Sequence, residues 1–67
     1  MNAKKLKSVL TKIEKAKEKI ATERDKLREL YDELDHHLLY IFDRGLEAIE
    51  NGISEIEDAI DIISEVV

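Results

Sequence analysis

The chain has 67 residues, contains no cysteine and no proline, and carries a formal net charge of −5. A chain of this length forms one domain at most and buries only about 60% of the surface that its unfolded form exposes. Disulfides and thiolate metal sites are excluded, so self-association is the stabilising device expected of this fold. Charged residues make up 40% and hydrophobic residues 43% of the chain, which is typical of long helices and coiled coils rather than of disorder.

The first predicted helix begins at Ala3, after Asn2 as a plausible N-cap. Along this segment an apolar residue recurs every seven residues, and a second, less regular position accompanies it. The first position holds Leu6, Ile13, Ile20, Leu27, Leu34 and Ile41, and the second holds Leu10, Lys17, Arg24, Tyr31 and Leu38. Lys17 and Arg24 can lay their methylene groups along an apolar line while their charges stay in water.

A reversal of the chain is expected where the heptad pattern changes phase, between Leu34 and Leu46. A slip of four residues indicates either a turn or a stutter in one continuous helix. Gly45 favours a late turn because glycine often ends a helix, whereas the charge pattern favours a turn near Asp35. We predict a reversal within residues 35–45, toward the earlier end. Two continuous helices docked head to tail would satisfy the same charges and remain the alternative.

The second predicted helix carries the most regular apolar line, or seam, of the chain. Its residues alternate spacings of four and three, the pattern that keeps one line facing a partner helix. They are Phe42, Leu46, Ile49, Ile53, Ile56, Ile60, Ile63 and Val67. Together with Leu6, Leu10, Ile13, Ile20, Leu27 and Leu34 of the first helix, they form the predicted core and oligomer seam.

Charge is divided between the two halves of the sequence. Residues 1–30 contain ten Lys or Arg and five acids, a net charge of +5, whereas residues 31–67 contain eleven acids and Arg44, a net charge of −10. Antiparallel helices would place the basic start beside the acidic end and relieve charges that oppose each helix dipole. A mid-chain turn would bring Lys5 near Glu65 and Lys12 near Asp58. The sequence therefore predicts an all-α antiparallel helical hairpin.

Apolar side chains beside the main seams need a cover that one hairpin does not provide. They are Val9, Ala16 and Leu30 in the first helix and Ala59, Ile62 and Val66 in the second. Two hairpins packed as a four-helix bundle would cover both sets. We therefore predict a homodimer whose function is to bind a larger, unidentified protein as an adaptor, inhibitor or assembly factor.

His36 and His37 are the side chains whose ordinary pKa lies near neutral pH. Glu33 and His36 have the Glu-x-x-His spacing, which resembles the ligands of ferritin-like di-iron bundles. The resemblance implies a metal site that a second copy would complete. The chain has one such motif, however, and both residues lie off the apolar line. A polar pair at a helix end is the favoured interpretation, so we expect no metal and no cofactor.

Five consecutive apolar residues, Leu38 to Phe42, cannot all face one seam of a helix. They either close the end of the bundle or form a partner-binding patch of the kind that aromatic anchors favour. Closure of the bundle is the favoured interpretation. Leu39 and Tyr40 are the residues expected to be exposed if the patch exists.

No motif indicates catalysis, because the serines and threonines have no histidine near them in sequence and no glycine-rich phosphate loop is present. We expect a non-enzyme. The acidic balance argues against nucleic-acid binding. An acidic face that imitates nucleic acid is a further alternative to solvated helix surface. It would consist of Glu47, Glu50, Glu55, Glu57, Asp58 and Asp61.

The longest apolar run is far shorter than the roughly 20 residues that a membrane-spanning helix needs, and no signal-peptide pattern opens the chain. We therefore expect a cytoplasmic protein without a membrane partner. Its composition is similar to that of small acidic helical accessory proteins encoded by phages and mobile elements, a likeness without a supporting motif.

Overall fold

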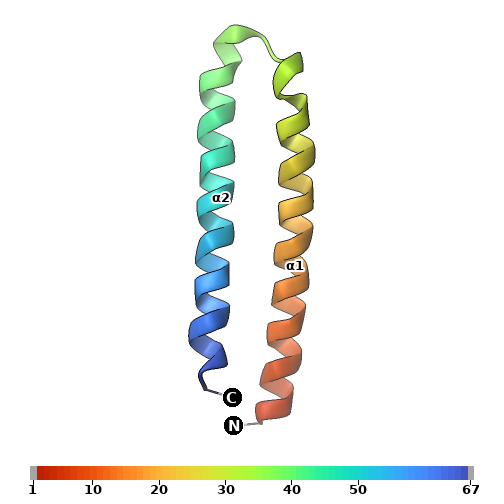
Figure 1. The fold of residues 1–67 in the computed structure, drawn as a ribbon, viewed down its shortest axis with the longest axis vertical. Helices are drawn as coiled ribbons and strands as arrows, with labels where there is room; N and C mark the ends of the chain where they lie inside the picture. Colours follow the sequence, from red (N-terminus) through yellow and green to blue (C-terminus); the bar gives the residue numbers. More distant parts are fainter. Residues whose placement is uncertain (1, 67) are drawn as a thin grey trace.

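A computed structural model describes residues 2–66 as two long helices joined by a short connection. Helix α1 spans Ala3–Glu29, the 3-10 helix η1 spans Leu30–Glu33, and helix α2 spans His36–Ser64. The long helices lie side by side and antiparallel, with both chain ends at the same end of the molecule (Figure 1). The predicted all-α hairpin is thus confirmed. Neither long helix is apolar enough along its length to cross a bilayer.

Helix α1 begins where the sequence predicted. The Asn2 side-chain oxygen accepts a hydrogen bond from the Lys5 amide at 3.1 Å, and the Asn2 carbonyl accepts one from the Leu6 amide at 3.1 Å. Asn2 has extended backbone angles, as an N-cap residue requires. The N-cap therefore satisfies an amide that has no partner within the helix.

The chain reverses at Leu34 and Asp35, whose ψ angles of 147° and 146° are extended. Asp35 is the first residue of the predicted range 35–45, and Leu34 lies one residue before that range. Gly45 is inside α2 and has no positive φ, so it does not end a helix. The phase change in the heptad pattern marks this short link, because two extended residues interrupt the helical rotation between the two seams.

The core is a single thin layer between the two long helices. Leu10, Leu46 and Ile53 are buried, each 7% exposed. The remaining contact residues are half-buried; they include Leu6, Leu27, Leu34, Phe42, Ile49, Ile56 and Ile60. Ile13, Ile20 and Ile63, also predicted in the seam, are instead 38–42% exposed, and Val67 lies outside the described residues. Two helices alone therefore cover only part of the apolar surface.

Polar side chains occupy the middle of the α1 seam. The side chains of Lys17 and Arg24 are only 18% and 23% exposed. Lys17 Nζ lies 3.8 Å from Glu57 Oε1 on α2, and the Arg24 guanidinium donates to Asp25 Oδ1 at 3.0 and 3.2 Å. Their aliphatic parts extend the apolar layer while their charged ends reach its edge. The core between the two helices is therefore least apolar near the middle of their length.

Candidate functional site

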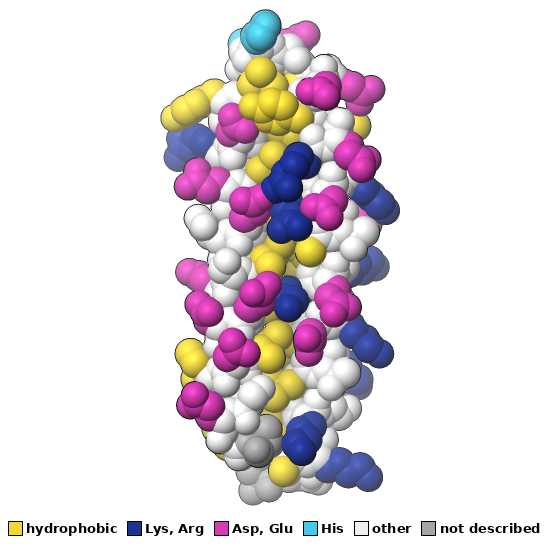
Figure 2. Space-filling view, in the orientation of Figure 1, with side chains coloured by type: hydrophobic (Ala, Val, Ile, Leu, Met, Phe, Trp, Pro, Cys, Tyr) yellow, Lys and Arg dark blue, Asp and Glu magenta, His cyan; other side chains and the backbone are white. Residues whose placement is uncertain are grey.

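One broad face of the hairpin is polar. Lys17 pairs with Glu57 and Arg28 pairs with Glu50 across the two helices. Acidic and basic side chains line the groove between the helices on this face, with an apolar strip at its floor (Figure 2). We call this the polar face. Ion pairs within one hairpin therefore join the two helices along this face.

The opposite broad face can be assigned from helical geometry. The line of each helix that points most directly at the other helix is the centre line, which consists of Leu10, Lys17, Arg24 and Tyr31 in the first half of the hairpin and of Leu39, Leu46, Ile53 and Ile60 in the second. The residue four positions after a centre-line residue lies on one flank, as Arg28 does after Arg24 and Glu50 after Leu46. The residues one position before and three positions after a centre-line residue lie on the other flank. Because both helices are right-handed and they run antiparallel, the residues of this second flank share the face opposite the polar one.

This second face is almost free of charge, and we call it the apolar face. Among residues 2–66, the only charged residue at these positions is Glu23, which pairs with Lys26 at 3.2 Å. Its members are Val9, Ile13, Ala16, Ile20 and Leu30 from α1 and η1, Leu38, Gly45, Gly52, Ala59 and Ile63 from α2, and Val66 just after the end of α2. The apolar face runs along most of the hairpin, so it is the main candidate for a protein interface.

Several large side chains on the apolar face are exposed to solvent. Val9 is 45%, Ile20 is 42%, Leu30 is 48% and Val66 is 60% exposed. Single exposed hydrophobic residues are ordinary on a protein surface, but a contiguous apolar patch marks an interaction site. These residues follow one face from the chain ends to the tip, which favours an interface along the whole hairpin.

Gly45 and Gly52 make the apolar face flat over the middle of α2. A methyl group added at either position would meet no atom within 4 Å, so packing within one hairpin does not require glycine there. Glycine inside a helix costs about 1 kcal/mol relative to alanine. Nothing within a single hairpin explains either residue.

A second exposed apolar patch, the hairpin tip, consists of Tyr40 and Ile41, which are 68% and 67% exposed. The Arg44 guanidinium lies 5.8 Å from the centre of the Tyr40 ring, a cation–π distance. Of the two residues predicted at this patch, Tyr40 is exposed and Leu39 is half-buried. Ile41 was assigned to the first seam because it continues that heptad, and the reversal places it on α2 instead.

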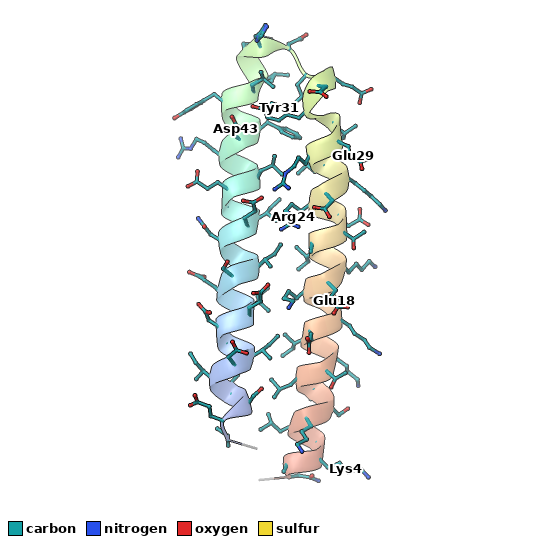
Figure 3. The ribbon with its side chains drawn as sticks, viewed as in Figure 1. Lys4, Glu18, Arg24, Glu29, Tyr31 and Asp43 are labelled. Atoms are coloured by element: carbon teal, nitrogen blue, oxygen red, sulfur yellow. The ribbon has the colours of Figure 1, made fainter. Side chains whose placement is uncertain are left out.

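Between the helices near the tip, the Tyr31 hydroxyl donates a hydrogen bond to Asp43 Oδ2 at 3.0 Å. Figure 3 shows the two side chains facing each other from opposite helices. The Tyr31 ring also packs edge-on against Phe42, with ring centres 6.0 Å apart. The hydrogen bond to Asp43 raises the pKa of Tyr31 above its ordinary 10.0, and burial and the Asp43 charge act in the same direction.

Replacing Asp43 with alanine is expected to lower the pKa of Tyr31, as measured by tyrosinate absorbance during alkaline titration. The raised folded-state pKa gives stability that is present below the unfolded value of 10.0 and is lost as the pH rises through the folded value. The Tyr31→Phe variant isolates the contribution of the other tyrosine, Tyr40. Superimposable titration curves for the wild type and Asp43→Ala would contradict the expected coupling.

The Glu33 and His36 pair does not lie on one helix. Glu33 ends η1 and His36 begins α2, with the extended link between them. The Glu-x-x-His spacing places two ligands on one face only in a continuous helix. Within residues 2–66, no three His, Asp or Glu side chains lie close enough to hold a metal ion together.

The acidic residues of α2 lie on the part of the helix surface outside both the seam and the apolar face. Glu50 and Glu57 pair with α1, whereas Glu55 and Asp58 lie farther from α1 by helical periodicity.

Comparisons of the chain with protein-family models, with curated proteins and with solved structures find no match.

Proposed function

We propose that the chain is a small non-enzymatic protein–protein interaction module that acts as a homodimer, with two hairpins packed into a four-helix bundle. The apolar face is the observation that carries this proposal. Only three of the described residues 2–66 are buried, which is little core for a chain of this size, and small scaffolds compensate by association. Burying exposed apolar surface stabilises by about 25 cal/mol per Å².

The size of the apolar face supports this pairing. The Cα trace extends 52 × 16 × 11 Å, so the outline of one broad face is similar in extent to the roughly 800 Å² of surface that each partner buries in a standard interface. Exposed residues of this face lie near the end of the hairpin that holds both chain ends, Val9 in the second turn of α1 and Val66 just after the end of α2. A second hairpin of the same length would cover the face from end to end.

The hairpin tip supports a second part of the proposal, binding of a larger protein. Tyr40 lies on the heptad line of Ser54, away from the apolar face, so dimerisation through that face leaves its ring exposed. Tyrosine and arginine are enriched among the residues that dominate binding energy at interfaces. The Tyr40 ring with Arg44 beside it fits such an anchor.

The homodimer is tested by sedimentation equilibrium of the purified wild-type chain at micromolar concentration. One chain has a mass of 7.8 kDa. We expect a helical particle of twice that mass, because the apolar face is covered only in the dimer. Circular dichroism on the same sample establishes that the particle is folded. A folded monomer that persists at this concentration would refute the homodimer.

A further inference from the structure

We propose that, in the dimer, α1 of each subunit packs against α2 of the other, so that the two hairpins point in the same direction. This inference rests on the proposed homodimer and specifies its arrangement. Two arrangements cover the apolar face while keeping all neighbouring helices antiparallel. In one, the two-fold axis is parallel to the helices and unlike helices meet; in the other, it is perpendicular and like helices meet.

Charge distinguishes these arrangements. Helix α1 contains ten Lys or Arg and five acids, a net charge of +5, and helix α2 contains seven acids and Arg44, a net charge of −6. Packing like helices together would oppose two basic helices and two acidic helices. Packing unlike helices together gives every helix two neighbours of opposite charge.

The helices are close enough for this difference to matter. Packed helices lie about 8–10 Å apart, and the Debye length at physiological ionic strength is about 8 Å. Charges at the edges of neighbouring helices are therefore only partly screened. Charges beside an apolar seam set orientation and partner choice in helical bundles, which is the role that we assign to them here.

The edge of α1 beside the apolar face provides the sharpest contrast. By heptad position this edge carries Lys12, Lys19 and Lys26. If like helices met, it would face the same lysine edge of the second copy. If unlike helices meet, it faces the edge of α2 that carries Glu55. The second arrangement exchanges repulsion between lysines for attraction to a carboxylate.

The contacts within one hairpin define which residues would meet. Lys17 is level with Glu57, and Tyr31 is level with Asp43. A two-fold axis parallel to the helices preserves these levels. It therefore places Ala16 beside Ala59 of the partner subunit. The same rule places Val9 beside Val66 of the partner subunit, near the ends of the chain.

The arrangement has a consequence for the hairpin tip. Two hairpins that point the same way bring both copies of Tyr40 and Ile41 to one end of the bundle, on opposite sides of the two-fold axis. A partner with two copies of its own site could then bind both at that end and would gain from simultaneous binding. Hairpins that point in opposite directions would separate the two patches by the length of the bundle.

Cysteine cross-linking tests the arrangement, and the wild-type chain has no cysteine to interfere. The Ala16→Cys and Ala59→Cys variants are prepared separately, one of them isotopically labelled, then unfolded together, refolded and oxidised. Mass spectrometry separates the three disulfide-linked dimers. Because each chain carries one cysteine, any disulfide joins two chains. Val9→Cys mixed with Val66→Cys is an independent second pair, and circular dichroism of the reduced samples establishes folding.

We expect the mixed disulfide to exceed the one-half share of random pairing in both mixtures, because disulfide bonding requires Cα atoms within about 7 Å. The Gly52→Cys variant alone should cross-link poorly. Efficient Gly52→Cys self-cross-linking, or a mixed disulfide at or below one-half, would overturn the arrangement while leaving the homodimer intact. A folded monomer in sedimentation of the reduced mixtures would instead overturn the homodimer and this inference together.

Discussion

Replacing Ile53 with alanine is expected to lower the free energy of unfolding by about 2–4 kcal/mol, the usual cost of removing a large buried aliphatic side chain. Ile53 is 7% exposed and is one of three buried residues in the described chain. The single core of a chain this short rarely supplies more than about 3–5 kcal/mol. The variant should therefore be largely unfolded at room temperature and at low protein concentration, as measured by circular dichroism during urea titration.

Ile41→Ala is the matched control for this prediction. It removes the same atoms from the same helix, but the Ile41 side chain is 67% exposed. Substitutions at exposed positions usually change stability by less than about 0.5 kcal/mol. Equal losses for the two variants would contradict the assignment of Ile53 to the core and of Ile41 to the tip.

Replacing Ile20 with glutamate is expected to weaken the proposed dimer strongly. Ile20 lies near the middle of α1 on the apolar face and is 42% exposed in the hairpin. In a monomer the carboxylate would stay in water, whereas in the dimer it would be buried without a partner, and a charge left unpaired in an interface costs about 2–5 kcal/mol. The dissociation constant should rise at least about thirtyfold, since 1.4 kcal/mol is tenfold.

Thr22→Glu provides the control for added charge on α1. Its side chain is exposed, its hydroxyl hydrogen-bonds only to the Glu18 carbonyl within the described chain, and its heptad position faces away from the apolar face. Sedimentation equilibrium of both variants over a concentration series measures the effect, and circular dichroism separates dissociation from unfolding. A wild-type dissociation constant for Ile20→Glu would remove the apolar face as the dimer interface.

The heptads and the division of charge predicted a helical hairpin, with two continuous helices docked head to tail as the alternative. An apolar line that repeats every 3.5 residues can only be buried against another helix. The opposite charges of the two halves favour antiparallel packing, and Asn2 has the side chain that an N-cap needs. These features are local or depend on summed charge, so they can be read from the order of the residues.

The reversal could not be placed to the residue, because Leu34 and Asp35 include neither glycine nor proline. Both adopt extended backbone angles that most residues can take. The contacts that the link allows distinguish these two residues from their neighbours in the chain. With the reversal at this point, the Tyr31 ring packs against Phe42 and the Tyr31 hydroxyl donates a hydrogen bond to Asp43. Gly45 suggested a later turn, but glycine is also tolerated inside a helix at a modest cost. Its presence therefore did not locate the reversal.

The sequence by itself determined that this chain forms two amphipathic helices with more apolar residues than one seam can bury. Only the tertiary structure decided where the remaining apolar residues lie. A heptad gives the distance of a residue from the seam of its own helix. It does not show on which broad face of the hairpin that residue lies. The antiparallel packing of two right-handed helices settles that question, placing Ile13 and Ile20 on the same face as Gly52 and Ala59, and the ion pairs on the other.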